Sequence, residues 1–371
     1  MKILICARGY NSGSENKFGN FELDQAKALK AAGCDVRIAS LDLRSPKSRR
    51  PHGAKLFAAH GMHCVTVNSF SSMLPGGFAG VYAEKAAEKA LHWICNDGWK
   101  PDIIHTHFTE ISSAFAAAAK RSGAKFVVTE HSSLMNTPSP DAKNLALAKN
   151  AYPKADRVIA VSNALAQNIR KSTGVTPVVI GNIVDINVFD SVSSGGGQPF
   201  RFVSCGNLVE IKQFEVLLKA FSKIHSDTAL LNIFGDGVKR NELLHLCRSL
   251  GISGRVSFRG HQSREVIAQE YARSDAFVLA SRSETFGVSF IEAMCSGLPV
   301  ISTECGGPQD IINEHNGMLV PVGDADALAK AMDKMMLTAI SYHRRRIRSY
   351  AVENFSPQGI AYKLIKLYKS I

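Results

Sequence analysis

The fold prediction rests on SRSETFGVSFIEAMCSGLPVISTECGGPQDII, residues 281–312. It follows the apolar run AFVLAS, which is typical of a buried parallel strand. A helix around Glu292 comes next, and a second apolar run then leads to Gly306. A strand, a turn, a helix and another strand in this order form a βαβ unit. The stretch therefore predicts an α/β fold with a parallel sheet.

The same alternation extends in both directions along the chain. A first series has apolar runs expected as strands at residues 2–7, 36–41, 64–69, 102–108, 125–131, 157–162 and 177–182, with helices expected from Phe21 to a stop at Gly33 and over 83–95 and 112–123. A second series has strands expected at 201–208, 229–237, 255–260, 276–281 and 298–304, with helices over 214–225, 239–251, 263–274 and 288–297. Such alternation implies two doubly wound parallel sheets, each covered on both faces by helices.

A serine- and glycine-rich stretch separates the two series. SVSSGGGQP, residues 191–199, has the composition of a flexible linker. We therefore expect an N-terminal Rossmann-like domain at 1–190, a linker at 191–199, a C-terminal Rossmann-like domain at 200–354 and a last helix at 355–371 that crosses back onto the first domain. The two domains would face each other across a cleft, because ligands of such sheets bind beyond the carboxyl ends of the strands.

Composition sets the class of protein. Of 371 residues, 45% are hydrophobic and 20% are charged, which excludes a disordered chain, a coiled coil and a collagen-like fibre. No apolar run approaches the roughly 18–20 residues that span a bilayer, and the N-terminus turns polar too early for a secretory signal. The eight cysteines form no Cys-x-x-Cys pair, so we expect reduced thiols and a cytoplasmic protein.

The net charge of +12 favours anionic partners or simply solubility. Two stretches, 44–55 and 71–91, are candidates for peripheral contact with the inner face of a membrane or with a lipid-linked acceptor; the alternative is a basic loop and a core-facing helix start. The arginine-rich run at 343–348 is typical of a solvated helix face. It has no interleaved aromatic residues, so nucleic-acid binding is not supported.

The residues around Glu284 indicate the kind of ligand. The turn after it offers the backbone N–H groups of Phe286, Gly287 and Val288 at a helix N-terminus, which suits a phosphate. A carboxylate would be repelled by that anion, so Glu284 and Glu292 are better suited to hydroxyl groups. Amides for phosphate and carboxylates for hydroxyls together describe a sugar nucleotide. The alternative is that Glu284 caps the helix and Glu292 is a solvated helix residue.

The ordered set of motifs resembles a known family. Ser283-Glu284-Thr285-Phe286-Gly287 with Ile291-Glu292-Ala293 is similar to the Glu-x7-Glu signature of the retaining glycosyltransferases of family four. Further motifs along the chain support the resemblance. They are Gly235-Asp236-Gly237, Phe258-Arg259-Gly260, Gly297-Leu298-Pro299-Val300, Gly306-Gly307 and the segment IGNIVDINVF near the domain junction. The resemblance extends over essentially the whole chain and is densest in residues 201–322.

The resemblance implies a GT-B fold whose C-terminal domain binds a nucleotide-sugar donor and whose N-terminal domain binds the acceptor. It implies that Glu284 contacts the donor sugar, that Glu292 holds the ribose hydroxyls and that Lys212 binds the diphosphate. Arginine is usual shortly before that lysine, whereas this chain has Asn207, for which Arg259 or Arg282 would compensate. The remaining donor-binding residues it implies are Gly235, Gly260, His261, Thr285, Phe286, Gly287 and Val288.

The resemblance to the family is looser in the first domain. Gly19-Asn20 stands where the family often has two glycines, and Gly19 would let backbone approach the donor or acceptor. His131 stands where the family places a cleft histidine near the donor sugar; the alternative is a packed or solvent-facing histidine. His105 and His107 resemble metal ligands only superficially, because no third ligand is evident.

We therefore expect a retaining hexosyltransferase that moves a sugar from a UDP- or GDP-sugar to a hydroxyl acceptor, with Glu284, Lys212 and His131 as its catalytic residues. No cofactor and no metal are expected. Surface polysaccharide or lipid-linked glycan assembly is the expected setting. Three alternatives stay open: another GT-B enzyme such as a sugar-nucleotide epimerase or a phosphorylase, a Rossmann oxidoreductase, which the missing Gly-x-Gly-x-x-Gly disfavours, and a non-catalytic binder of sugar nucleotides.

Overall fold

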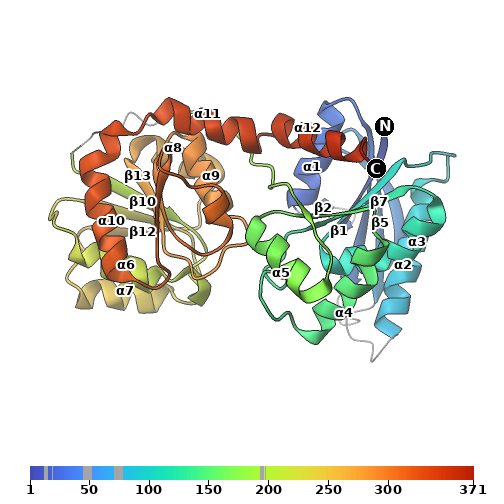
Figure 1. Ribbon diagram of the computed structural model, residues 1–371, viewed down its shortest axis with the longest axis horizontal. Helices are drawn as coiled ribbons and strands as arrows, with labels where there is room; N and C mark the ends of the chain where they lie inside the picture. Colours follow the sequence, from blue (N-terminus) through green and yellow to red (C-terminus); the bar gives the residue numbers. More distant parts are fainter. Residues whose placement is uncertain (12–15, 19, 45–51, 71–77, 193–195, 197) are drawn as a thin grey trace. The chain divides into compact units, whose positions relative to one another are not determined.

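The computed structural model describes residues 1–11, 16–18, 20–44, 52–70, 78–192, 196 and 198–371. The chain divides into two compact units, which are described separately (Figure 1). Unit 1 comprises Met1–Ile183 and Pro357–Ile371, and unit 2 comprises Val184–Ser356. The serine- and glycine-rich stretch at 191–199 lies within unit 2, and parts of it, 193–195 and 197, fall outside the described residues.

Unit 1 is built on a sheet with the strand order β4-β5-β3-β1-β6-β7-β8-β9. Its parallel strands are β1 (Lys2–Asn11), β3 (Asp35–Arg44), β5 (Met62–Phe70), β6 (Ile103–His107), β7 (Lys125–Glu130), β8 (Arg157–Ala160) and β9 (Val178–Val179). All the strands expected in the first series are confirmed. The sheet buries β1 on both faces, since Ile3, Leu4 and Ile5 are fully buried, as a parallel strand between helix layers requires.

Two strands of unit 1 depart from the parallel pattern. β4 (Gly53–Ala59) runs antiparallel to β5, and β2 (Asn16–Phe18) runs antiparallel to β1. The alternative of a basic loop over 44–55 is therefore wrong at both ends, because Arg44 ends β3 and residues 53–55 begin β4; residues 45–51 lie outside the described residues. The reason is that an antiparallel edge strand needs only backbone pairing with β5 and one covered face, so its sequence carries little apolar signal.

The helices of unit 1 cover the sheet in two groups. α1 (Asn20–Ala31) packs against α12 (Pro357–Tyr368), while α2 (Phe78–Ile94), α3 (Thr109–Ser122) and α4 (Ala142–Ala151) pack in a row (Figure 1). α5 (Asn163–Thr173) follows β8, capped by Ser162 at its start. The final helix α12 brings Ile360, Leu364 and Tyr368 into the core of unit 1, so the end of the chain returns to the first unit.

Unit 2 is built on a fully parallel sheet with the order β12-β11-β10-β13-β14-β15. Its strands are β10 (Arg201–Cys205), β11 (Leu230–Phe234), β12 (Val256–Gly260), β13 (Ala276–Leu279), β14 (Val300–Thr303) and β15 (Gly317–Val320). Its helices are α6 (Phe214–Lys223), α7 (Arg240–Ser249), α8 (Arg264–Arg273), α9 (Val288–Cys295), α10 (Ala325–Thr338) and α11 (Arg344–Phe355). α6 packs on α7 and α10, and α9 packs on α8 and α11. The order reverses between β10 and β13, which is the point where parallel sheets bind ligands.

Candidate functional site

The loops after β10, β11 and β12 meet through glycines at the carboxyl edge of the unit 2 sheet. Gly206 N–H donates to Phe234 O at 3.0 Å, and Gly235 N–H donates to Gly260 O at 2.8 Å. Gly235 has a φ of +124°, and a Cβ at this position would lie 2.0 Å from the carbonyl oxygen of Gly206. Only glycine fits here, because any side chain would push the two loops apart.

Lys212 and Glu284 form an ion pair at the same edge. Lys212 ends the short 3-10 helix Glu210–Lys212, and its Nζ lies 2.5 Å from Glu284 Oε1. The Ser281 hydroxyl donates to the same carboxylate oxygen at 2.7 Å. Glu284 N–H donates to Cys305 O at 2.8 Å, which ties the loop after β13 to the loop after β14. Glu284 is only 8% exposed, so the ion pair with Lys212 lies in a largely buried position.

The helix that follows Glu284 begins after a glycine. The N-cap of α9 is Gly287, in the left-handed region with a φ of +98°, and no side chain caps it. Gly287, and not Glu284, therefore occupies the N-cap position of this helix. The first turn of α9 contains no acidic residue, so its N–H groups and the helix dipole remain suited to an anion.

Two more cations stand beside Lys212. Arg282 and Lys239 each form an ion pair with Glu210, at 3.1 Å in both cases. The two cations hold the pKa of the Glu210 carboxyl below its ordinary value, Lys239 most strongly. Arg282 N–H also donates to Ile211 O at 2.8 Å. Both the side chain and the backbone of Arg282 thus contact the 3-10 helix Glu210–Lys212.

Glu292 is paired rather than solvated. Arg264, the first residue of α8, places its Nη2 2.8 Å from Glu292 Oε1. The Glu292 side chain is 14% exposed, and burial raises its pKa, while Arg264 partly offsets the shift. The alternative of a solvated helix residue is therefore wrong. The short pattern around Glu292 gave no sign of Arg264, since the two are far apart in sequence.

The other residues expected to bind the donor lie at the carboxyl ends of the unit 2 strands. Thr285 and Val288 are half-buried beside the turn. Phe286 is buried against Phe355, and the centroids of the two rings are 5.7 Å apart. A Cβ at Gly307 would lie 2.5 Å from the backbone of Phe286, so the loop after β14 presses closely against this turn. The residues that follow β10 and β12 and are exposed there are Asn207 and His261.

Unit 1 carries a second polar cluster at the carboxyl ends of its strands. His131 follows β7 and is 8% exposed. Its Nδ1 lies 2.7 Å from Asn182 Oδ1, so Nδ1 carries the proton. Burial lowers the pKa of His131 to about 3, so the ring is neutral and its Nε2 accepts. His107 Nδ1, 2.9 Å from that nitrogen, must then donate. Both ring nitrogens of His131 are thus occupied by neighbours within unit 1.

His107 and His105 are buried in a stacked row with His131. The ring centroids of His105 and His107 are 4.8 Å apart, and those of His107 and His131 are 5.1 Å apart. His105 bonds Thr129 through Nε2 at 2.7 Å and Tyr368 through Nδ1 at 2.6 Å. Among the described residues, no group of three or more His, Cys, Asp or Glu side chains is placed to hold a metal ion. His107 Nε2 is buried and has no hydrogen-bond partner in that part of the chain.

Three residues of unit 1 were not expected at this cluster. Arg8 lies over the Phe108 ring at 3.3 Å and pairs with Glu22 at 3.6 Å. Burial raises the pKa of Glu22, an effect that Arg8 partly offsets. Phe108 has a φ of +65°, a strained conformation for a bulky residue that often marks functional sites. The predicted site at Gly19 lies outside the described residues, and its neighbour Asn20 is the exposed first residue of α1.

Comparison with known proteins agrees with this architecture. HepE from Anabaena, in a crystal structure described as a complex with UDP-glucose, superposes with a TM-score of 0.73 at 20% identity over 100% of each chain. That likeness shows that the protein has the GT-B fold. Two family models match adjacent segments of the chain, with residues 20–188 matching glycosyltransferase family 4 and residues 190–353 matching glycosyl transferases group 1. The two models together match most of the chain, which therefore belongs to the glycosyltransferases that these models describe.

Relatives of known name are similarly distant. N-acetyl-alpha-D-glucosaminyl L-malate synthase of Bacillus anthracis is 27% identical over 83% of this chain and 82% of its own length. The lipopolysaccharide core biosynthesis glycosyltransferase LpsE of Rhizobium meliloti is 36% identical over 36% of this chain and 38% of its own. No helix of the described residues is long and apolar enough to cross a membrane.

Proposed function

We propose that the protein transfers a hexose from a nucleoside diphosphate sugar, UDP- or GDP-linked, to a hydroxyl acceptor with retention of the anomeric configuration. The observation that carries this proposal is the Lys212–Glu284 ion pair, 2.5 Å long, at the carboxyl edge of the unit 2 sheet next to the uncapped start of α9. It combines a cation for the diphosphate with a carboxylate for sugar hydroxyls.

The charges of the site fit a diphosphate leaving group. Lys212 has three N–H donors, so it can hold Glu284 with one and a phosphate oxygen with another. Lys239 is shared between Glu210 and Glu242, so it is not free to act on a diphosphate. We propose that Arg282, near the 3-10 helix of Lys212, stands in for the arginine that Asn207 replaces. Preorganised donors of this kind stabilise the charge that develops on the departing diphosphate. In our proposal the diphosphate itself accepts the acceptor's proton, and no metal is required.

Glu292 and Arg264 form a second polar pair for the donor. Arg264 orients the Glu292 carboxylate from one side at 2.8 Å. A carboxylate accepts through two oxygens, so the pair leaves acceptor capacity for the two ribose hydroxyls. We assign Glu292 to the ribose and Glu284 to the transferred sugar.

The comparisons support this choice of donor and setting. HepE of Anabaena was solved with UDP-glucose, and LpsE of Rhizobium meliloti is named for lipopolysaccharide core biosynthesis. We therefore place the acceptor among surface polysaccharides or lipid-linked glycans. The B. anthracis relative is named for a product of malate, a small hydroxy acid, so small anionic acceptors belong in the first screen.

Donor binding is the first experiment. We would measure thermal stabilisation of the full chain with UDP-, GDP- and ADP-sugars and with each free diphosphate. A ligand at about 100 times its Kd adds about 2.7 kcal/mol of stability. We expect stabilisation with one nucleotide series only and the same preference in transfer assays. Absence of stabilisation with every nucleotide would contradict the proposal.

Product analysis separates the remaining alternatives. Incubation of the donor without acceptor would yield a rearranged sugar nucleotide from an epimerase, and a phosphorylase would require free phosphate. A binder without catalysis would be stabilised but give no product. Retention is read from the anomeric configuration of the product by NMR, and activity in excess EDTA tests whether a metal is needed.

A further inference from the structure

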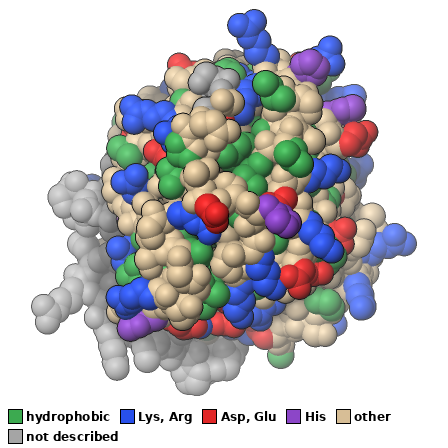
Figure 2. Space-filling view, turned by 90° about the vertical axis from the view of Figure 1, so that its left-hand side faces the viewer, with side chains coloured by type: hydrophobic (Ala, Val, Ile, Leu, Met, Phe, Trp, Pro, Cys, Tyr) green, Lys and Arg blue, Asp and Glu red, His purple; other side chains and the backbone are tan. Residues whose placement is uncertain are grey.

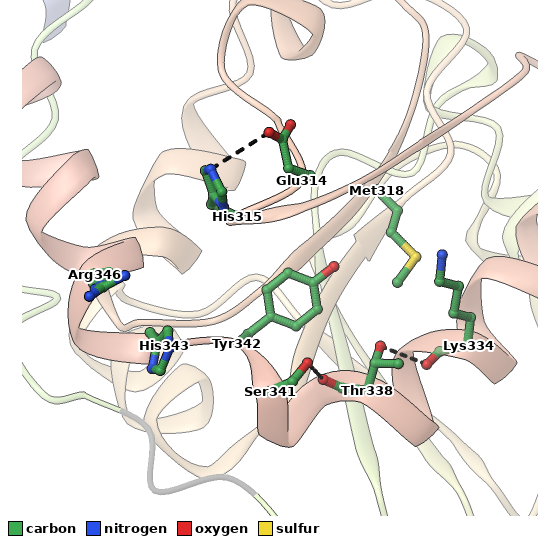
Figure 3. A pocket seen from close by; sticks show the side chains of 9 residues that line it. All are labelled: Glu314, His315, Met318, Lys334, Thr338, Ser341, Tyr342, His343 and Arg346. Atoms are coloured by element: carbon green, nitrogen blue, oxygen red, sulfur yellow. Dashed lines mark hydrogen bonds and ion pairs between the residues drawn. The ribbon is translucent and has the colours of Figure 1, made fainter.

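A cavity of about 330 Å³ lies in unit 2, away from the carboxyl edge of the sheet that carries the candidate donor site (Figure 3). It is bounded by the loop before β15, by α10 and by the start of α11. Figure 3 shows the Tyr342 ring near its middle, with Lys334 on one side and Arg346 and His343 on the other. Its volume lies in the range of small-ligand sites, roughly 300–1,000 Å³.

The lining of this cavity is cationic. Lys334 and Arg346 are exposed side chains, and no carboxylate of the described residues pairs with either. His315 and His343 add ring N–H groups. The one acidic side chain in the lining, Glu314, is 82% exposed and lies 3.6 Å from His315. Nearby Asp333 is occupied by His225, at 2.6 Å. The cavity therefore presents net positive charge to an incoming ligand.

The start of α11 carries positive side chains that interact unfavourably with the helix dipole. Three consecutive arginines, Arg344–Arg346, occupy its first turn, which contains no acidic residue. The N-cap His343 makes no side-chain capping bond. Cations at a helix N-terminus are repelled by the positive end of the helix dipole. A bound anion would be attracted both by these cations and by the dipole. The arrangement thus favours an anionic partner over bare solvent.

Two apolar side chains stand beside the cavity. Leu337 is 82% exposed and Ile340 is 88% exposed. They are three residues apart and so share one side of the chain at the end of α10, next to Lys334, Thr338 and Ser341, which face the cavity. Figure 2, turned so that the side of unit 2 with α10 faces the viewer, shows Lys and Arg side chains spread among apolar and acidic ones. A partner that covers these two side chains would remove their apolar surface from water, which favours binding.

From these observations we infer that the end of α10 and the start of α11 form a docking surface for an anionic phospholipid membrane. The cavity with Lys334 and Arg346 would take headgroup phosphates, and Leu337 and Ile340 would insert at the acyl boundary. A protein partner fits less well, because a stable interface buries about 800 Å² on each side and its centre is depleted in charge. Here two apolar side chains stand near Lys334, beside a cavity that has a second cation, Arg346. The net charge of +12 agrees with this partner.

The test measures binding of the full chain to vesicles by flotation. One set of vesicles is pure phosphatidylcholine, and the other contains phosphatidylglycerol. We expect binding only to the second set, with a decline as salt rises. Lys334→Gln with Arg346→Gln should weaken it about 25-fold, from about fivefold for each cation. Leu337→Ser with Ile340→Ser should weaken it at least tenfold.

Matched control variants show whether the loss of vesicle binding is specific to this surface. Tyr362→Ser removes another large exposed side chain, 70% exposed, and Lys219→Gln removes an exposed cation of α6. Both should bind vesicles like the unchanged protein. All variants are checked for unchanged melting temperature, because exposed residues of this kind contribute little to stability.

Three outcomes would overturn the inference. The first is no binding to either set of vesicles. The second is binding that both double variants retain, which would move the contact elsewhere. The third is that glycerol phosphate stabilises the protein through Lys334 and Arg346 while the Leu337 and Ile340 changes have no effect, which would make the cavity a site for a soluble phosphate. Sugar transfer is not needed for any of these measurements, so a failure of the proposed function would leave them interpretable.

Discussion

The polar clusters of the two units solve the same geometric problem with opposite chemistry. Both lie at the carboxyl ends of parallel strands. The cluster of unit 2 is ionic, with Lys212 against Glu284 and Arg264 against Glu292. The cluster of unit 1 is centred on neutral rings, with His105, His107 and His131 stacked in a row.

The difference follows from how each cluster is built. In unit 2 the charged groups keep partners of opposite charge, and close contacts at glycines hold the loops together. In unit 1 burial removes the charge from the histidines, and their hydrogen bonds then fix which nitrogen carries each proton. An ionic cluster is suited to a charged diphosphate, whereas a neutral one is suited to positioning hydroxyls. The predictions below test that contrast.

The largest effect is expected from the ionic cluster. Lys212→Met and Glu284→Gln should each lower kcat/KM for transfer by about 100–1000-fold, because each removes a preorganised group that acts on the reacting sugar or diphosphate. Steady-state transfer assays measure it. The control is Lys223→Met, which breaks the exposed ion pair with Asp326, 2.6 Å long, and should leave the rate unchanged. Near-normal turnover of folded Lys212 or Glu284 variants would refute their roles.

The second prediction concerns acid. Burial lowers the pKa of His105 and His131 to about 3 from an ordinary 6.5, and lowers that of His107 in the same direction. The unfolded chain therefore binds protons below about pH 6.5 that the folded chain does not, and stability falls as pH drops from 6.5 toward 3. Each histidine contributes up to about 1.4 kcal/mol per pH unit.

Hydrogen exchange measures this loss separately in the two units. Amides of β6 and β7 should lose protection between pH 6.5 and 5 faster than those of β10 and β13. Glu22 in unit 1 and Glu292 in unit 2 act in the opposite direction, because burial raises both pKa values, and there is one in each unit. Equal loss of protection in the two units would contradict the contrast.

The third prediction concerns the glycine contacts that shape the ionic cluster. Gly235→Ala should destabilise unit 2 by about 1–3 kcal/mol or more. The reason is that Gly235 has a positive φ and that a Cβ at this position would lie 2.0 Å from a carbonyl oxygen. Chemical denaturation measures the change. Gly254→Ala is the matched control, because a Cβ there meets nothing within 4 Å, and it should shift stability by less than about 0.5 kcal/mol. Equal effects of the two changes would show that the loop contact is unimportant.

The smallest effect is expected where the last helix meets the neutral cluster. Tyr368→Phe removes the hydroxyl that lies 2.6 Å from His105 Nδ1 and should cost about 1 kcal/mol, detected as faster exchange in unit 1 only. Tyr362→Phe, at a side chain 70% exposed, should be neutral. If Tyr368→Phe is also neutral, Gln25, which lies 2.8 Å from the same nitrogen, is sufficient to hold His105.

Most strands and the main helices of both units could be predicted because buried parallel strands are continuous apolar runs. α4, α5, α10 and β15 lie outside the segments expected from the pattern. The edge strand β4 was not recognised, since pairing at an edge depends on the neighbouring strand rather than on its own sequence. Of the site, Glu284, Glu292 and Lys212 stood in recognisable short motifs.

The partners of those residues could not be found the same way. Arg264 is separated from Glu292 by β13 and two loops, and Lys239 is separated from Glu210 by α6 and β11. Likewise Asn182, from the segment after β9, reaches His131 after β7. No local spacing reports such pairs, because they form only when the strand order of the sheet brings separate loops to one edge.

Local sequence was enough to predict the alternation of strands and helices, the division into two α/β series and the loop motifs that carry Glu284 and Glu292, because each depends on neighbours within a few residues. The folded structure was needed to establish which charges are paired, which histidines are neutral and which nitrogens of His107 and His131 donate. It also decided that Leu337 and Ile340 remain exposed beside a cationic cavity. Those properties depend on burial and on contacts between distant segments, and burial is what sets the energy of a charge.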